Sequence, residues 1–228
     1  MLKTLLKGDR APSTLCVMAH ADDETIIAGG LLARIARLGA RVKVVILCGR
    51  DQVRRTELAE ACRILGAEHE ILDYMDGTLT PQMEPEILKT VVARIRSDKP
   101  ELVVTHDPEF DYNKDHLMLG EWVRFACQKA GMSDQGHRPD LVISGEVHIP
   151  IPFPDYIVDI SEDMDRMLEA LRAHKSQLEA GHKQGYYTRL LEQRCRWRGA
   201  QAGCDGAMAF RRLPLPVIGD LYKKSPLI

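Results

Sequence analysis

One histidine and three consecutive acidic residues follow an apolar run near the start of the chain. Residues 17–24 read VMAHADDE, so His20, Asp22 and Asp23 come directly after a stretch typical of a buried strand. Three adjacent carboxylates repel one another, and a bound cation is the simplest way to make them compatible. We therefore expect metal chemistry at these residues. The alternative is that Asp22 only caps a following helix and that His20 has no role.

A second polar cluster occupies residues 106–116, which read HDPEFDYNKDH. It also follows a strand-like run and opens a helical pattern. Two histidines and one carboxylate with an open coordination position form a recurring arrangement in catalytic zinc sites. The expected ligands are His20, Asp23 and one histidine of the second cluster. Asp22 would remain free for proton transfer, because a metal lowers the pKa of bound water toward about 7.

Strand and helix patterns alternate along the first part of the chain. Apolar runs predict strands at 14–20, 41–48, 68–74 and 101–105, and helical spacing predicts helices at 24–38, 52–65, 84–97 and 116–130. This alternation is typical of βαβ units with right-handed crossovers and a mainly parallel sheet. We expect an α/β fold, a Rossmann-like three-layer sandwich, in which both polar clusters meet at the carboxyl edge of the sheet.

The pattern changes in the last third of the chain. Further strands are expected at 141–147 and 156–159, and a helix at 163–173. The tail, 193–228, is rich in Arg, Gly and Pro and is expected to be irregular or to cover one edge, with its Arg-rich run 194–198 in a surface loop. No boundary marks a second domain. The prediction is a single domain over 1–228 with a core of about 14–180.

The composition is that of an ordinary soluble globular protein: of 228 residues, 45% are hydrophobic and 28% are charged, and the net charge is −2. This balance gives no support for a nucleic-acid-binding surface. No apolar run approaches the roughly 18 residues of a membrane span, and the N-terminus does not read as a secretory signal. The six cysteines form no Cys-x-x-Cys pair, so we expect buried free thiols and a cytoplasmic protein.

Residues 19–24, AHADDE, closely resemble the AHPDDE signature of the PIG-L/LmbE family of metal-dependent N-deacetylases. Residues 111–116, DYNKDH, resemble the second motif of that family, which ends in Asp-His. Weaker likenesses follow in the family's order at 54–57 (RRTE, with LG at 65–66), 76–79 (DGTL) and 173–177 (AHKSQ). The resemblance spans roughly residues 14–180.

Carried over by position, the resemblance implies that zinc is held by His20, Asp23 and His116, with Asp22 as the general base. It also implies that three further residues contact the substrate: Arg54, Asp76 and His174.

Two positions depart from the pattern of the family. Ala21 replaces the usual proline, which removes no ligand. Asn113 stands where several members have a histidine that helps to stabilise the tetrahedral intermediate. An asparagine amide can donate to an oxyanion but cannot act as a general acid. The proton for the leaving amine would come from Asp22 or from another histidine. His148 shares a strand face with Glu146, and one of the two could contact substrate.

The resemblance thus implies a zinc-dependent hydrolase that removes the acetyl group of an N-acetylated amino sugar or sugar conjugate, and it raises the expectation of a homo-oligomer. Iron and nickel are alternatives to zinc, because these ligand types accept several metals. One rival function is a phosphoacceptor receiver domain, with Asp73 or Asp76 as the phosphorylated residue. The other is a metal-dependent hydrolase of a different bond, such as a phosphoester.

Overall fold

The computed structural model describes residues 10–133, 136–179 and 184–215. Within this part of the chain, seven strands form one sheet: β1 (Thr14–His20), β2 (Val42–Cys48), β3 (Glu68–Tyr74), β4 (Leu102–His106), β5 (Leu141–Gly145), β6 (Tyr156–Asp159) and β7 (Ala207–Arg212). Their order in the sheet is β3-β2-β1-β4-β5-β7-β6. The strands from β3 to β5 pair in parallel, and β7 runs antiparallel to both β5 and β6.

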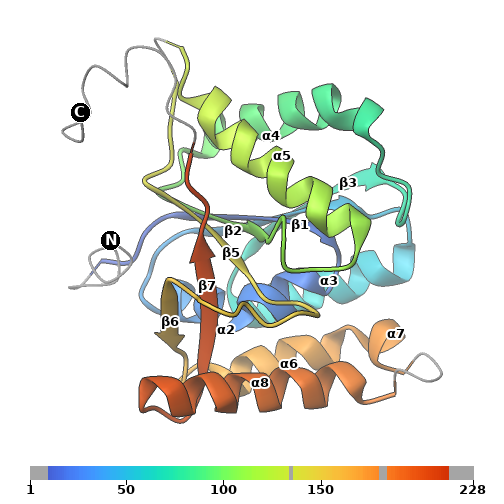
Figure 1. The fold of residues 1–228 in the computed structure, drawn as a ribbon. Coiled ribbons are helices and arrows are strands. Elements are labelled where there is room, and N and C mark those ends of the chain that lie inside the picture. Colours follow the sequence, from blue (N-terminus) through green and yellow to red (C-terminus); the bar gives the residue numbers. More distant parts are fainter. Residues whose placement is uncertain (1–9, 134–135, 180–183, 216–228) are drawn as a thin grey trace.

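Helices cover both faces of the sheet (Figure 1). One face carries α4 (Glu84–Asp98) and α5 (Lys114–Ala130), with the short 3-10 helix η1 (Pro81–Met83) leading into α4. The other face carries a larger set of helices: α2 (Asp23–Arg37), α3 (Gln52–Leu65), α6 (Met164–Ala173), α7 (Lys175–Leu178) and α8 (Tyr186–Ala202). The result is the predicted three-layer α/β sandwich.

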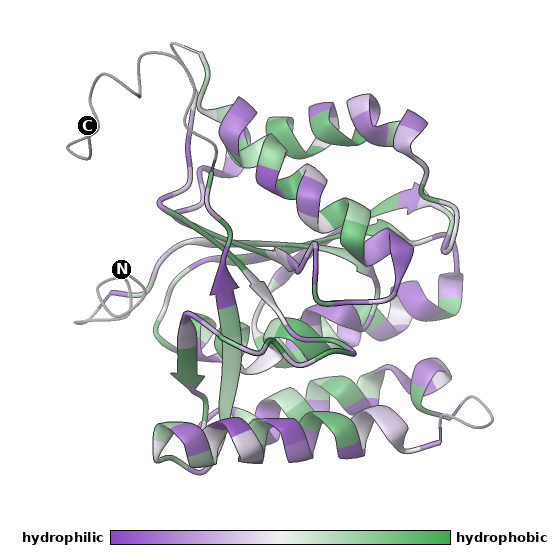
Figure 2. Cartoon of the chain, viewed as in Figure 1, coloured by the Kyte–Doolittle hydropathy of each residue, from purple (hydrophilic) through white to green (hydrophobic). Residues whose placement is uncertain are grey.

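The central strands β1 and β4 are buried along their whole length and are mostly apolar, because both of their faces are covered. All seven residues of β1 are buried, and the side chains that alternate along it enter two separate hydrophobic clusters. The covering helices carry hydrophobic and hydrophilic segments in alternation (Figure 2), as expected for elements with one buried face. These two clusters lie between the sheet and the helices that cover its two faces.

The first polar cluster and the second follow neighbouring strands. From β1 the sheet extends through β2 to β3 in one direction and through β4 to β5 in the other. The chain therefore leaves β1 and β4 toward opposite sides, and a crevice forms at their carboxyl ends, where α/β sheets bind ligands. The predicted meeting of the two clusters at this edge is confirmed.

The prediction of an irregular tail over 193–228 is wrong for the part that the structure describes. Helix α8 and strand β7 occupy most of residues 186–212, and β7 lies inside the sheet between β5 and β6. The Arg-rich run does not lie in a surface loop, because Arg194 and Arg198 are buried on the inner face of α8. Residues 216–228 lie outside the described residues.

The predicted state of the cysteines is confirmed: all six are free, and five are buried. Burial raises the pKa of the Cys62 and Cys127 thiols, so these groups remain protonated small hydrophobes at neutral pH. Across the described residues, no helix combines the length and the apolar character that a membrane crossing needs.

Candidate metal centre

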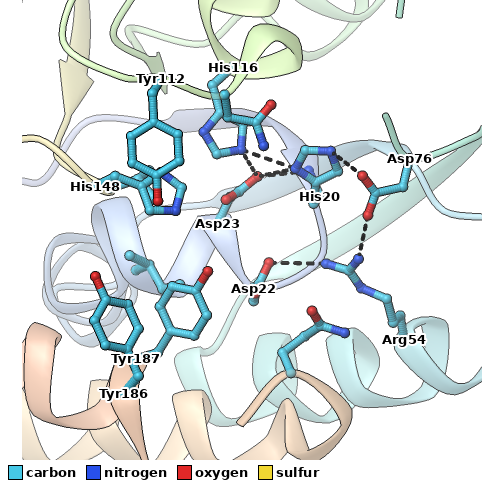
Figure 3. A pocket seen from close by; sticks show the side chains of 14 residues that line it. His20, Asp22, Asp23, Arg54, Asp76, Tyr112, His116, His148, Tyr186 and Tyr187 are labelled. Atoms are coloured by element: carbon cyan, nitrogen blue, oxygen red, sulfur yellow. Dashed lines mark hydrogen bonds and ion pairs between the residues drawn. The ribbon is translucent and has the colours of Figure 1, made fainter. Parts of the chain in front are cut away.

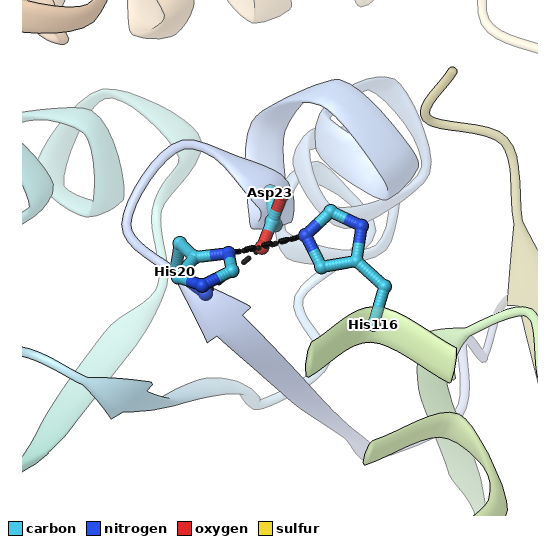
Figure 4. Close-up of side chains that lie close together, drawn as sticks. All are labelled: His20, Asp23 and His116. Atoms are coloured by element: carbon cyan, nitrogen blue, oxygen red, sulfur yellow. Dashed lines mark hydrogen bonds and ion pairs between the residues drawn. The ribbon is translucent and has the colours of Figure 1, made fainter. Parts of the chain in front are cut away.

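Three side chains from two separate segments of the chain converge at the carboxyl edge of the sheet (Figure 4). His20 ends β1, Asp23 begins α2, and His116 lies in the first turn of α5. Nδ1 of His20 lies 3.1 Å from Nε2 of His116, and Oδ2 of Asp23 lies 3.2 and 3.3 Å from these two nitrogens. Ligand atoms of a tetrahedral zinc ion, at bonds of about 2.0–2.1 Å, are roughly 3.4 Å apart. The triad therefore fits a divalent metal.

Carboxylates behind the triad orient both imidazole rings. Nδ1–H of His116 donates to Oδ2 of Asp111 at 2.8 Å. On the far side of His20, Nε2 lies 3.2 Å from Oδ2 of Asp115 and 3.0 Å from Oδ1 of Asp76. Because an ionised carboxylate can only accept, these contacts fix the tautomers with the lone pairs on Nδ1 of His20 and Nε2 of His116. Both lone pairs then face the same point, beside Asp23.

The electrostatics of the triad favour a positive charge. Burial lowers the pKa of His116, but Asp23 and Asp111 outweigh burial and raise it to about 9. Burial raises the pKa of Asp23, yet the charge on His116 and the close approach of Nε2 of His106, 3.3 Å from Oδ2, hold it well below its usual range. A site that stabilises imidazolium so strongly also stabilises a cation held between the same groups.

His106 plays a different part from His116. It is fully buried, its Nε2 accepts the backbone N–H of Ala19 at 2.9 Å, and its ring stacks on that of His116 at 4.0 Å. Burial, followed by the charge of His116, lowers its pKa to about 4, so it is neutral. Because its Nε2 lone pair already accepts a hydrogen bond, this nitrogen is not free for a metal. The ring of His106 instead packs against that of His116. Of the two histidines in the second cluster, the structure brings His116 into the triad.

Asp22 occupies the N-cap position of α2 but does not cap the helix through its side chain. Its backbone lies in the left-handed region at φ 119°, which is strained for a residue with a Cβ. The carboxylate instead lies 3.2 Å from Nη2 of Arg54. The interpretation of Asp22 as a simple helix cap is therefore wrong, and its side chain lines the cavity.

The pKa of Asp22 is raised to about 6. Burial is the main cause and the charge of Asp23 adds to it, while Arg54 and His174 act in the opposite direction. A carboxylate with this pKa is ionised at neutral pH yet accepts a proton more readily than an exposed aspartate does, as a general base requires.

Arg54 and Asp76, the two residues that the resemblance associates with substrate, line the cavity beside the triad. Arg54 lies in the first turn of α3, which Asp51 caps by accepting the backbone N–H groups of Val53 and Arg54. Nη1 of Arg54 lies 2.8 Å from Oδ2 of Asp76, and Nη2 donates to the backbone oxygen of Ala21 at 2.6 Å. The guanidinium thus joins three segments of the cavity wall.

His174 does not lie where substrate contact would require. It is fully buried outside the cavity lining, and its Nε2 lies 2.8 Å from Oε1 of Glu24. The other carboxylate oxygen of Glu24 accepts the backbone N–H of Asp22 at 3.0 Å. His174 therefore acts on the cavity through Glu24, and the predicted direct contact with substrate is corrected to a supporting role.

Asn113 lines the cavity at the N-cap of α5. Its Oδ1 accepts the backbone N–H of Asp115 at 2.9 Å. The cap uses only the oxygen of the amide, which leaves the NH₂ group as a donor for a ligand.

The cavity itself has a volume of about 440 Å³ (Figure 3). Sequence reasoning missed several of its lining residues: Tyr112, Gln177, Tyr186 and Tyr187. Tyr112 lies inside the second motif, where its side chain carried no signal of its own. The two tyrosines of α8 come from the segment expected to follow the core, and no local pattern marks them.

The pair Glu146 and His148, which the sequence placed on one face, separates in the structure. His148 lines the cavity, and its Nδ1 lies 2.9 Å from Oδ1 of Asp111. Glu146 is buried behind it, where it pairs with Arg198 and accepts the backbone N–H of Ile151 at 2.7 Å. Of the two, His148 is the residue that can contact a ligand.

Comparison with known proteins places these features in context. The family described as GlcNAc-PI de-N-acetylase, PIG-L, matches residues 15–127. A probable N-acetyl-alpha-D-glucosaminyl L-malate deacetylase of Bacillus cereus is 27% identical over 186 residues, which cover 73% of this chain and 84% of that protein. A diacetylchitobiose deacetylase of Thermococcus kodakarensis is 30% identical over 187 residues, which cover 72% of this chain and 69% of that protein.

The fold is also similar to that of a solved structure, the N,N'-diacetylchitobiose deacetylase from Pyrococcus horikoshii. The TM-score is 0.79 at 23% identity, and the match covers 99% of this chain and 90% of the other. This likeness concerns the fold.

Proposed function

This chain belongs to the PIG-L family, and from that premise we propose that it is a zinc-dependent hydrolase that removes the acetyl group from an N-acetylated amino sugar or sugar conjugate. The observation that carries the proposal is the convergence of His20, Asp23 and His116 beside a second carboxylate, Asp22, which lines the same cavity outside the triad. The relatives named above act on N-acetylglucosamine attached to different groups, which supports the amino sugar as the shared part of the substrate.

Zinc bound by the triad would supply a Lewis acid that polarises the acetamido carbonyl and makes water more acidic. The chain supplies the remaining groups. Asp22, with its pKa of about 6, takes a proton from the attacking water. Asp111 and Asp115 keep the ligand nitrogens pointed at the metal position.

Two further steps fall to residues of the cavity. The NH₂ group of Asn113 donates to the oxyanion that forms when water adds to the carbonyl. Asp22 then returns the proton to the amine as the C–N bond breaks, so that water and the N-acetyl sugar become acetate and the free amino sugar. Arg54 and Asp76 hold the sugar hydroxyl groups and keep Asp22 in place.

The topology does not favour the receiver-domain alternative. A receiver has the strand order 2-1-3-4-5, which puts its third strand in the interior of the sheet. Here β3 is the edge strand, and the side chain of Asp73 near its end is three-quarters exposed. Asp76 is engaged by His20 and Arg54 instead of standing free for phosphorylation.

A two-metal phosphoesterase is disfavoured by the ligand set. Such sites hold two ions about 3.5–4 Å apart, each with its own ligands. In the described residues, the other groups of potential ligands share His20 or His116 with the triad. The arrangement therefore suits one ion.

An acetate-release assay tests the proposal. The protein is stripped with a chelator, reloaded with zinc, and offered N-acetylglucosamine, its disaccharide, and conjugates of N-acetylglucosamine with malate and inositol. We expect acetate from at least one conjugate with the reloaded protein and not with the stripped protein, and release that is slower by about 10²–10⁴-fold with the Asp22→Asn variant. Absence of acetate from the whole panel with a fully loaded protein would contradict the proposal.

A further inference from the structure

Four aromatic rings gather on one side of the cavity, away from Arg54 and Asp76 (Figure 3). Tyr112 comes from the loop before α5, His148 from the loop after β5, and Tyr186 and Tyr187 from the start of α8. The rings contact one another in sequence: Tyr112 and His148 are stacked at 4.3 Å, His148 and Tyr187 lie 6.4 Å apart, and Tyr187 and Tyr186 meet edge to face at 5.2 Å. We call these four residues the aromatic wall.

The aromatic wall reaches from the bottom of the cavity to its mouth. The ligand triad is at the bottom, where His20, Asp23 and His116 are each at most 5% exposed. At the mouth, Tyr112 is 68% exposed and Tyr186 is 42% exposed. An acetamido group that reaches the triad leaves the rest of its molecule beside these two exposed rings.

Exposure of two tyrosine rings at a cavity mouth calls for an explanation, because large apolar surfaces left in water are unfavourable. Packing within the protein already orders both rings, through the contacts of Tyr112 with His148 and of Tyr186 with Tyr187. A pre-ordered aromatic surface binds flat partners at little cost in conformational entropy. The C–H face of a pyranose ring is such a partner, with hydroxyl groups around its edge for the polar side of the cavity.

The polar side of the cavity, which faces the aromatic wall, disfavours the binding of an anionic substrate. Among the described lining residues, Arg54 is the one cation besides the histidines, and it is shared by Asp22 and Asp76 at 3.2 and 2.8 Å. A carboxylate or phosphate on the substrate would have to displace one of these aspartates or lie against it. Asp76, whose side chain is about half exposed, instead offers an acceptor for sugar hydroxyl groups.

We infer that Tyr112 and Tyr186 form a subsite for a second, uncharged pyranose linked to the N-acetylated sugar. The protein then prefers a neutral N-acetylglucosamine oligosaccharide to a conjugate whose attached group carries a carboxylate or phosphate. This inference rests on the proposed deacetylase function and specifies the substrate class for the same site.

The test compares kcat/KM for acetate release from the β-1,4-linked disaccharide of N-acetylglucosamine with that from the monosaccharide. We expect the disaccharide-to-monosaccharide ratio to fall on the order of tenfold in Tyr112→Ala and Tyr186→Ala. The Phe variants at both positions keep the ring and should keep the ratio. Phe153→Ala removes an exposed aromatic ring that does not line the cavity, and serves as the matched control.

Two results would overturn the inference. One is an unchanged ratio in both Ala variants when their melting temperatures show that they are folded. The other is a higher kcat/KM for N-acetylglucosaminyl malate than for the uncharged disaccharide with the wild-type protein.

Binding to the zinc-loaded Asp22→Asn variant separates this inference from the proposed function. Calorimetry should detect disaccharide binding to Asp22→Asn and a roughly tenfold weaker affinity when Tyr112→Ala is added. If this pattern is found while the wild type releases no acetate, the subsite is supported and the proposed deacetylase reaction is contradicted. If the wild type releases acetate but Tyr112→Ala leaves the affinity for the disaccharide unchanged, the reaction is supported and the subsite is contradicted.

Discussion

Nδ1–H of His116 donates to Oδ2 of Asp111 at 2.8 Å, which turns the opposite ring nitrogen toward Nδ1 of His20. A carboxylate behind a ligand histidine fixes the tautomer of the ring and increases its basicity. Asp111 lies only five residues before His116, yet it is separate from the ligand triad. We therefore expect Asp111 to contribute to the affinity of the proposed zinc site.

Asp111→Asn should therefore weaken zinc binding by about 10–100-fold without removing a ligand. Oδ1 of Asp111 accepts the backbone N–H groups of Tyr112 and Asn113. An asparagine that keeps its oxygen at this place turns its NH₂ group toward His116, where two donors would face each other, so His116 loses its preferred orientation. Competition with a fluorescent zinc chelator measures the effect. Asp73→Asn, which removes a carboxylate on the exposed edge strand, should leave the affinity unchanged. Equal zinc affinities of wild type and Asp111→Asn would contradict the assignment.

The pKa of Asp22 predicts an acid limb in the pH profile of kcat. A general base must be ionised, so kcat should fall about tenfold per pH unit below pH 6 and level off above it. Arg54 lowers this pKa, and its removal in Arg54→Gln should move the limb to higher pH. The measurement is acetate release from pH 4.5 to 9, with Arg50→Gln as a control outside the cavity lining. A limb that stays in place in Arg54→Gln would show that another group titrates.

Asn113 combines two roles that a pair of substitutions can separate. Asn113→Ser keeps an oxygen that can cap α5 but loses the amide donor, whereas Asn113→Ala loses both. We expect Ala to destabilise the fold by about 1 kcal/mol and Ser to do so by less. Both should lower kcat by about 100-fold or more if the amide stabilises the oxyanion. Wild-type kcat in the Ser variant would leave Asn113 as a helix cap only.

His174 is predicted to support the fold and not to bind substrate. His174→Ala would leave the buried carboxylate of Glu24 without its partner, which should cost on the order of 3 kcal/mol in the free energy of unfolding. A substrate contact would instead raise KM at unchanged stability. Chemical denaturation and steady-state kinetics together distinguish the two outcomes, with His174→Gln as a variant that can still donate to Glu24.

The pH dependence of this stabilisation follows from the signs of the two shifts. Burial opposes both charges, but the pairing lowers the pKa of Glu24 and raises that of His174. The contribution of Glu24 is present above its ordinary value of 4.5 and is lost as pH falls through its lowered pKa. The contribution of His174 is present below its ordinary value of 6.5 and is lost as pH rises through its raised pKa. The difference between wild type and His174→Ala should be largest between these two values.

The strands and helices up to residue 130 could be predicted because each has a period that matches its structure. The apolar run from Leu15 to Ala19 in β1 predicts a buried strand, and the helical spacing of α5 predicts a helix. Helix α8 could not be predicted in the same way, because its buried face carries Arg194 and Arg198. These arginines are satisfied by Glu146 and by backbone oxygens of Ile26, Val147 and Ile151, partners that lie far away in the sequence.

The residues of the cavity also include some that the sequence could predict and some that it could not. His20, Asp22 and Asp23 could be named from the sequence because they are consecutive at a strand end and share one chemistry. The aromatic wall could not, since its rings come from three segments that only the fold brings together. His174 was assigned a substrate contact because its segment resembles the family, although burial places it behind Glu24.

One measurement compares zinc-dependent acetate release by wild type, Asp22→Asn and Asp23→Asn and counts the metal in each protein. It tests whether Asp23 binds the metal while Asp22 acts as the general base. We expect about one zinc per chain in wild type and in Asp22→Asn, and a turnover number that is lower by about 10²–10⁴-fold in Asp22→Asn. Asp23→Asn should lose zinc and activity together, because Asp23 is one of the three proposed ligands. A wild-type protein that takes up no zinc, or an Asp22→Asn variant that retains both zinc and full turnover, would contradict the division of roles between the two adjacent aspartates.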